Sequence, residues 1–308
     1  MRRPIFVMRG GSALAVRRGS AEGFAFLSPV VIVLVVTVGG PLLFTLAISF
    51  TSASFLGTLA DLRIVGLRNY VTVLTSTSFQ HAFIVTIEFA LFTVTAEMLL
   101  GLGTGLLLAE EFPGRTLLRV LLIVPWAIPT VVNAITWRLI YAPDFGALNA
   151  LLQQTGVITD YRSWLGDPSV ALYAIGVADI WKNFPIVGLI VLAALQTAPR
   201  DLYDAAHVDG AGIFRRFSTI TFPHIAGPLM VALVLRTIDT IKVFDIVWVM
   251  TRGGPFSSTK PMSMLVYERT FSNLESGIGS AIAFIITLVC LVLIIAYSRL
   301  LKRQSRSA

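Results

Sequence analysis

The chain has 308 residues, of which 56% are hydrophobic and only 13% are charged. This leaves too little polar surface to cover a soluble globular protein of this length, so that class is excluded. The formal net charge is +7, but no soluble basic face with interleaved aromatic residues is present, which argues against a nucleic-acid partner. The composition predicts an all-α integral membrane protein.

Six apolar runs are long enough to cross a hydrocarbon core of about 30 Å, which takes roughly 20 residues each. The predicted spans are Phe24–Phe50, Ala82–Ala109, Leu117–Tyr141, Val170–Leu195, Ile225–Met250 and Ile278–Arg299. The first run is longer than that of a signal peptide and lacks a small-x-small cleavage site, so we expect it to be retained. Residues 24–299 are then one transmembrane domain between a basic N-terminal segment, 1–23, and a tail, 300–308.

Basic residues are distributed unequally between the two alternating sets of loops. The set that includes both termini and the loop between the fourth and fifth spans holds 14 Lys and Arg residues, and the other set holds 6. Because basic loops stay on the cytoplasmic side, both termini and the loop at 200–223 are predicted to be cytoplasmic. Anionic lipid headgroups are natural neighbours of these inner loops.

Cysteine and histidine usage predicts neither a disulfide nor a metal site. Cys290 is the single cysteine, so no disulfide can form within the chain, and its position in the last span indicates a small apolar filler. The three histidines, His81, His207 and His224, are too scattered in sequence to predict metal ligation.

The first two spans contain local interruptions. Gly39-Gly40-Pro41 predicts that the first span is kinked or loosened towards its outer end. In the second span Glu88 and Glu97 would be costly in lipid, so they must face protein or water, either as a proton relay or paired with a neighbour. The alternating glycines of Gly101–Gly105 lack the spacing of a nucleotide-binding loop and predict close helix contact instead.

Prolines and polar residues also mark the third span and the loop after it. Pro125 and Pro129 are predicted to break this span, and such interruptions are tolerated where the freed carbonyls face protein or a wet cavity. Asn133, just beyond them, is therefore a candidate for a solute pathway. The outer loop Ala142–Asp167 is long enough to form a short surface element.

The fourth span carries a polar segment, Asp179–Pro185. Asp179 and Lys182 are three residues apart and share a helix face, so they can partly neutralise each other. A structural ion pair and a pathway role both remain open. Asn183, Trp181 and the helix-breaking Pro185 favour hydrogen bonding and stacking on a polar solute.

Four charges of alternating sign follow at three-residue steps in the predicted fifth span: Arg236, Asp239, Lys242 and Asp245. We expect neighbours to pair, and the stripe to face the bundle, a partner chain or a cavity, because it cannot face acyl chains without a cost of several kcal/mol. The candidate pathway residues are Asn133, Asp179, Trp181, Lys182, Asn183, Asp239, Lys242 and Asp245.

The loop between the fourth and fifth spans has a fixed order of helix and turn signals. Asp204–Gly210 is followed after nine residues by Ile220–Pro223. This order predicts a short helix, a bend at Gly210 and a second helix that Pro223 ends. The spacing resembles the EAA loop of the membrane subunits of binding-protein-dependent ABC importers, with Asp204 in place of the usual Glu and Phe222 in place of Leu.

Further segments extend the resemblance over nearly the whole chain. They are Ser49–Thr51, Val65–Tyr70, Leu235–Asp239, Lys242–Asp245, Met250–Pro255, Tyr267–Phe271 and Gly277–Ala281. Among these importers the chain looks like the maltose-F or glycerol-phosphate-A type of sugar permease.

The resemblance implies a function and a set of partners. It implies a bacterial inner-membrane permease that pairs with a second homologous permease, rests on two copies of a cytoplasmic ATPase, and receives a sugar or polyol from an external solute-binding protein. ATP and Mg would belong to the ATPase subunits, and this chain has no GxxxxGK[ST] segment and no cofactor of its own. The implied coupling residues are Asp204, Ala205, Ala206, Asp209, Gly210, Arg215, Arg216 and Pro223. For the two arginines, orientation of the chain by positive charge is the alternative role.

Three other functions would require different features in the sequence. A proton-coupled secondary transporter would use intramembrane carboxylates such as Glu88, Glu97 or Asp239. A membrane enzyme would need a Ser-His arrangement or an HExxH segment, and neither is present. A purely structural subunit would not explain the charges in the fourth and fifth spans.

Overall fold

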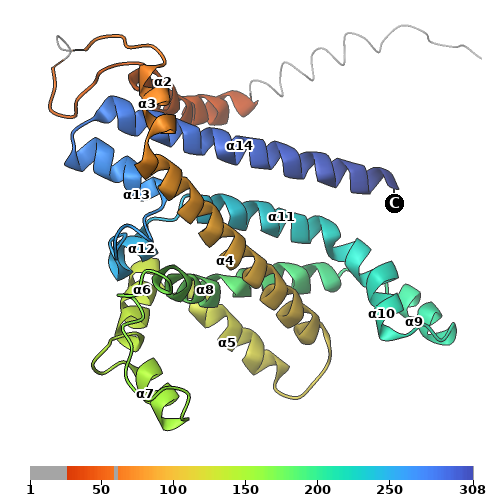
Figure 1. The fold of residues 1–308 in the computed structure, drawn as a ribbon. Helices are drawn as coiled ribbons and strands as arrows, with labels where there is room; N and C mark the ends of the chain where they lie inside the picture. Colours follow the sequence, from red (N-terminus) through yellow and green to blue (C-terminus); the bar gives the residue numbers. More distant parts are fainter. Residues whose placement is uncertain (1–25, 59–61, 308) are drawn as a thin grey trace, which may run out of the picture.

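The computed structural model describes residues 26–58 and 62–307 (Figure 1). Within these ranges the regular elements are helices, and an isolated antiparallel bridge joins Thr51 to Ile64. The labelled helices are α2 (Gly40–Ser49), α3 (Arg68–Thr75), α4 (Thr77–Ala109), α5 (Arg115–Ala127), α6 (Thr130–Ile140), α7 (Ala147–Gln154), α8 (Ala171–Leu195), α9 (Arg200–Val208), α10 (Ile213–Arg216), α11 (Phe222–Ile241), α12 (Asp245–Met250), α13 (Met262–Tyr267) and α14 (Ser276–Ser307). The predicted basic segment 1–23 lies outside the described residues.

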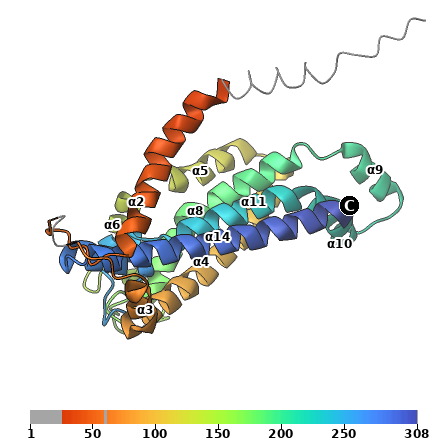
Figure 2. The same cartoon turned by 90° about the horizontal axis from the view of Figure 1, so that it is seen from above.

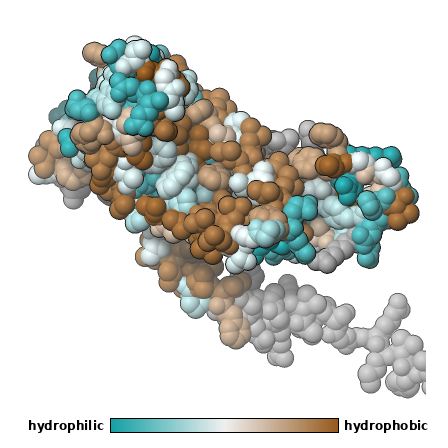
Figure 3. Space-filling model, turned by 90° about the horizontal axis from the view of Figure 1, so that it is seen from below, coloured by the Kyte–Doolittle hydropathy of each residue, from teal (hydrophilic) through white to brown (hydrophobic). Residues whose placement is uncertain are grey.

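Several helices have the length and composition of membrane spans. Five qualify individually: Phe26–Ser49, Thr77–Ala109, Ala171–Leu195, Ile213–Ile241 and Ser276–Arg299. A sixth is present if α5 and α6 count as one span, although they meet at an angle of 96°. Figure 3 shows hydrophobic side chains across the middle of one face and hydrophilic ones gathered towards its two ends. The chain is therefore an integral membrane protein.

The centre of the bundle is the close packing of α4 against α8. A Cβ atom built on Gly105 would lie 2.6 Å from Val191, and one on Gly101 would collide with Val187, so these two positions accept only glycine without a shift of the helices. Gly103 has open space around it. The predicted helix contact is thus confirmed at two of the three glycines.

Two of the prolines lie within continuous helix, where the sequence predicts a kinked or loosened first span at Pro41 and a helix end at Pro223. Pro41 and Pro223 each follow a π-helical turn, Val35–Gly39 in the first case and Phe217–Thr221 in the second. In each turn an N–H bonds to the carbonyl five residues earlier, which widens the helix where the proline lacks its own N–H. The prediction that Pro223 ends the second helix of the loop is wrong, because helix continues from Ile213 to Ile241.

Two further boundaries differ from the prediction. Pro185 does not break α8, which is continuous from Ala171 to Leu195. The predicted fifth span ends early, since α11 stops at Ile241 and α12 begins at Asp245 after a break. The Ser263 hydroxyl donates to the carbonyl of Val243 in this break and so satisfies a backbone group that the interrupted helix leaves free.

The elements gather at two ends of the bundle. Figures 1 and 2 place α9, α10 and the C-terminus at one end, and Figure 1 places α7, α12 and α13 at the other. The segments at the first end belong to the loops predicted to be cytoplasmic. Their common position agrees with the prediction that alternate loops lie on the same side of the membrane. Which side is cytoplasmic stays a prediction.

Candidate functional site

Three helices bring ionised side chains together inside the bundle. Arg236 of α11 donates to both carboxylate oxygens of Glu97 on α4, with Nε to Oε2 at 2.7 Å and Nη2 to Oε1 at 3.0 Å. The same Nη2 lies 3.4 Å from Oδ2 of Asp179 on α8. All three side chains are at most 10% exposed. This group of three residues is called the buried triad below.

The pairing geometry explains why charges are tolerated at this depth. A guanidinium that binds a carboxylate through two parallel N–H groups has a strong, directional interaction, and it offsets part of the cost of removing both ions from water. The expectation that a neighbour satisfies Glu97 is confirmed. Neither Glu97 nor Arg236 was among the predicted site residues, because nothing local in the sequence places positions 97 and 236 in contact.

The triad borders a cavity of about 500 Å³, called the charged cavity below. Its lining residues are Thr130, Asp179, Asn183, Arg236, Asp239, Thr240, Lys242, Val243, Phe244, Asp245 and Ile246. Asp239 lies 3.8 Å from Arg236 and 3.7 Å from Lys242, so the predicted pairing along the stripe holds for these steps. Asp245 belongs to the separate helix α12.

Five of the eight predicted pathway residues line this cavity: Asp179, Asn183, Asp239, Lys242 and Asp245. Asn183 donates to Oδ1 of Asp179 at 2.9 Å, which orders the cavity wall of α8. The spacing along the sequence predicts an ion pair between Asp179 and Lys182. In the structure Asp179 pairs with Arg236 instead, because the packing of α11 against α8 brings the guanidinium within 3.4 Å of its carboxylate.

The other three predicted residues lie away from the lining. Lys182 donates to the Trp126 carbonyl at 3.3 Å, where α5 approaches its break. The Trp181 ring packs edge-on against Trp137, with centroids 6.0 Å apart. Asn133 is buried and donates to the Ala178 carbonyl at 3.2 Å. These contacts join α5 and α6 to α8 and stabilise the bent pair.

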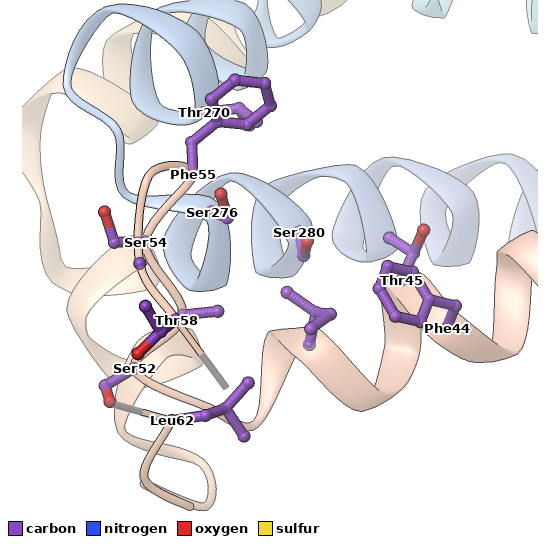
Figure 4. Close-up of a pocket in the computed structure, with 13 residues that line it drawn as sticks. Phe44, Thr45, Ser52, Ser54, Phe55, Thr58, Leu62, Thr270, Ser276 and Ser280 are labelled. Atoms are coloured by element: carbon purple, nitrogen blue, oxygen red, sulfur yellow. The ribbon is translucent and has the colours of Figure 1, made fainter. Parts of the chain in front are cut away.

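A second, smaller cavity of about 370 Å³ differs in character. Figure 4 shows it between α2, the loop that follows α2, and the start of α14. Hydroxyl groups such as those of Thr45, Ser276 and Ser280 line it together with the rings of Phe44 and Phe55, and its lining contains no ionised side chain. Of these two cavities, the one beside the triad is lined by ionised side chains and the smaller one is not.

The loop between α8 and α11 is a helical turn closed by local backbone hydrogen bonds. Gly210 has a φ of +68°, and the turn is closed by Gly210 N–H to His207 O at 3.1 Å and Ala211 N–H to Ala206 O at 2.9 Å. These two bonds form the Schellman arrangement that ends a helix with a left-handed residue. The predicted first helix and bend are present in the structure as α9 and Gly210, whereas the predicted second helix is α10, the first turn of the continuous helix Ile213–Ile241.

The turn is tied to the bundle but its tip is open. Tyr203 Oη lies 3.0 Å from Thr221 Oγ1, and His224 Nε2 lies 3.1 Å from the Ala194 carbonyl. Asp204, Ala205, Asp209, Gly210 and Arg215 are exposed, whereas Ala206 and Arg216 are half-buried. Phe214 is 90% exposed.

Comparisons with known proteins identify the family. Residues 97–306 match the family model described as "Binding-protein-dependent transport system inner membrane component". The chain belongs to this family. It is 40% identical to the trehalose/maltose transport system permease protein MalF of Thermococcus litoralis, over 91% of this chain and 93% of the relative. It is also 33% identical to the trehalose transport system permease protein SugA of Mycobacterium tuberculosis, over 90% and 87% of the two chains.

The fold of this permease also occurs in a solved structure. A bacterial ABC transporter involved in the import of the acidic polysaccharide alginate superposes with a TM-score of 0.80 at 21% identity, over 93% of this chain and 96% of that one. The sequence-based resemblance to importer permeases is therefore confirmed.

Proposed function

We propose that this chain is a permease subunit of an ATP-driven importer that moves a neutral sugar into the cell. The observation that carries the proposal is the position of the charged cavity on a helix that continues, without interruption, into the exposed turn. Arg236 lies near one end of the helix Ile213–Ile241, and α10 forms its other end. A displacement of the turn therefore moves a wall of the cavity.

The cavity is suited to a small polar solute. Its volume of about 500 Å³ lies within the range of small-molecule sites, roughly 300 to 1,000 Å³. Its lining combines carboxylates, an ammonium, a guanidinium, an amide and hydroxyls, which are the donors and acceptors that sugar hydroxyls require.

The charge balance of the lining favours a neutral solute over an anionic one. Three carboxylates, on Asp179, Asp239 and Asp245, face two cations, on Arg236 and Lys242, and Glu97 adds a fourth carboxylate behind the lining. The guanidinium is already engaged by Glu97 and Asp179. An anionic sugar would meet excess negative charge, whereas a sugar such as trehalose or maltose would not.

The mechanism we propose is alternating access. A second homologous permease completes the solute path, and two copies of a cytoplasmic ATPase bind the turn, with both termini on the same side of a bacterial inner membrane. ATP binding draws the permeases together and opens the cavity to an external solute-binding protein; hydrolysis reopens it inward. This chain catalyses no reaction and binds no cofactor, since ATP and Mg are held by the ATPase subunits. For ATP hydrolysis to be coupled to transport, ATP and the solute must differ in their affinity for the outward-open and inward-open states.

Roles at the turn follow from exposure. The exposed side chains of Asp204, Asp209 and Arg215 can form charge-assisted hydrogen bonds with the ATPase. The small residues Ala205 and Gly210 allow the ATPase to approach the backbone of the turn closely. Arg216, which is half-buried, lines a cavity of about 670 Å³ together with Glu110, Glu111 and Arg115.

Uptake by the reconstituted importer tests this function. Vesicles that contain this chain, its partner permease and the ATPase, supplied with the binding protein, should accumulate labelled trehalose or maltose only with internal ATP. Uptake that persists without ATP and collapses with the proton gradient would contradict the proposal and favour a secondary transporter.

A further inference from the structure

The cavity of about 670 Å³ at the base of the turn lies where α4 and α8 end. The loop that joins α4 to α5 forms one part of its wall, and α9 and α10 form another. Figure 1 shows this loop at the same end of the bundle as α9 and α10. The cavity shares no lining residue with the charged cavity, so it needs an occupant of its own.

Four charged side chains of both signs line this cavity. Glu110 and Glu111 directly follow the end of α4, Arg115 begins α5, and Arg216 belongs to α10. Within the described part of the chain, none of the four takes part in an ion pair. The two signs balance, so the lining is complementary to a ligand that carries one positive and one negative group.

The guanidinium of Arg115 has an unused hydrogen-bond donor. Its Nε is buried and donates to no atom of the described residues, although the side chain as a whole is half-buried. The Nε of Arg119, one turn further along α5, is also buried and unpaired. Because a buried donor without an acceptor is costly, an acceptor from outside the chain is expected here. Phosphate oxygens suit this role, since guanidinium groups bind them through charge-assisted hydrogen bonds.

Apolar side chains adjoin the charged ones in the same cavity. Leu106 and Leu107 belong to the last turn of α4, and Ile213 begins α10. Leu107 is 52% exposed and Ile213 is 75% exposed. Because α4 and α8 have the length and composition of membrane spans, charges just beyond their ends lie at the level of the lipid headgroups. A phospholipid carries both charged groups and apolar chains to this level.

We propose that this cavity binds the headgroup of an aminophospholipid. Arg115 and Arg216 bind the phosphate, Glu110 and Glu111 bind the ammonium group, and the apolar part of the wall contacts the acyl chains. An anionic headgroup without an amine would reach the arginines but would meet the two carboxylates unpaired. The site therefore selects an amine-bearing headgroup over a purely anionic one.

Lipid binding to the purified importer in detergent tests the site. Delipidated importer is titrated with phosphatidylethanolamine or phosphatidylglycerol, and bound lipid is counted by native mass spectrometry. Arg115→Gln should lower the affinity for phosphatidylethanolamine by about fivefold. Arg115→Lys, which keeps the charge, should bind this lipid more tightly than Arg115→Gln does. Glu110→Gln combined with Glu111→Gln should reverse the preference and favour phosphatidylglycerol.

Arg299→Gln is the matched control. Arg299 is exposed near the C-terminus, which lies at the same end of the bundle, and it does not line the cavity. This variant should bind lipid as the wild type does. Equal affinities for Arg115→Gln and the control would overturn the proposal, as would an unchanged headgroup preference when both glutamates are replaced.

Two further outcomes would identify a different occupant. Free phosphoethanolamine has both charged groups but no acyl chains; if it displaces the lipid at equal concentration, the site binds a soluble ligand. If Arg115→Gln lowers co-purification of the ATPase and leaves lipid binding unchanged, a segment of the ATPase fills the cavity. Either result would overturn the assignment to a lipid. Because these measurements follow lipid binding, they can fail while ATP-dependent sugar uptake succeeds.

Discussion

The buried triad and the exposed turn both contain arginine and carboxylate side chains, but these side chains have different surroundings in the two regions. In the triad, Arg236 is 10% exposed and held by two carboxylates from other helices. In the turn, Arg215 and Asp204 lie on the surface, and the described residues form no ion pair with either. The triad depends on contacts between distant parts of the chain, and the turn depends on local backbone geometry.

The difference assigns separate tasks to the two regions. The ion pairs of Arg236 with Glu97 and Asp179 link α11 to α4 and α8, which favours one packing arrangement of the three helices. Exposed ions contribute little to folding, so they are free to contact a partner. A substitution in the triad should therefore affect stability first, and one at the turn should affect coupling first.

The largest effect is expected at the centre of the triad. Arg236→Ala leaves Glu97 and Asp179 as uncompensated buried carboxylates, which should destabilise the protein by about 3–5 kcal/mol. Thermal unfolding of the purified importer in detergent measures the loss.

Glu97→Gln and Asp179→Asn combined with Arg236→Met should recover part of that stability, because no charge of the triad is then left without its partner. Arg138→Ala is the control, since its guanidinium is exposed and makes only a 3.4 Å contact to the Val249 carbonyl. A midpoint for Arg236→Ala equal to that of the control would show that the triad does not hold the helices together.

A smaller effect on stability is expected where α4 meets α8. Gly105→Leu places atoms where Val191 already lies, so we expect a loss of about 1–3 kcal/mol and a lower unfolding temperature. Gly103→Leu is the matched control, because its Cβ meets nothing within 4 Å. Equal midpoints for the two variants would contradict the observed packing of these helices.

At the turn, Gly210→Val should cost about 1–2 kcal/mol locally, since a β-branched residue resists the left-handed conformation. Its Cβ meets no neighbour, so only the backbone is strained. The rate of sugar uptake should fall strongly, whereas the unfolding temperature should change only slightly. Gly210→Asn, which tolerates this conformation, should transport nearly as well as the wild type; a loss equal to that of Gly210→Val would mean that the backbone conformation is not what matters.

The smallest effect on stability is expected for Asp204→Lys. The side chain is exposed, so the unfolding temperature should not change, but less ATPase should co-purify with the permease if Asp204 faces it. Asp144→Lys, exposed in the loop between α6 and α7, makes the same charge change without this loss. Undiminished co-purification of the ATPase with Asp204→Lys would remove that residue from the docking surface.

The features that could be predicted from the sequence are those that depend on residues close together in the chain. Apolar length indicated the spans, and the placement of Gly210 indicated the turn, because both follow from properties of neighbouring residues. The break at Lys242–Phe244 was missed, since the apolar pattern continues through it and the carbonyl of Val243 finds its partner, Ser263, only in the folded chain.

The triad shows the limit of sequence pattern most clearly. Spacing favoured Asp179 with Lys182, but the contact is with Arg236, 57 positions away. Only the packing of α4, α8 and α11 brings Glu97 to the same guanidinium. The prolines differ in their effect. Pro129 lies at the predicted break between α5 and α6, whereas the π-helical turn before Pro223 accommodates that proline without ending the helix.

Accessibility of the charged cavity during the ATP cycle tests the central claim most directly. Cys290 is the single cysteine and is buried, so Cys290→Ser with Asp239→Cys gives one thiol in the cavity wall. An impermeant thiol reagent applied from outside should label this thiol faster when the ATPase is trapped with ATP and the binding protein is present than in the resting importer. Labelling that is the same in both states would contradict the claim that the ATP cycle, acting through the turn, opens this cavity.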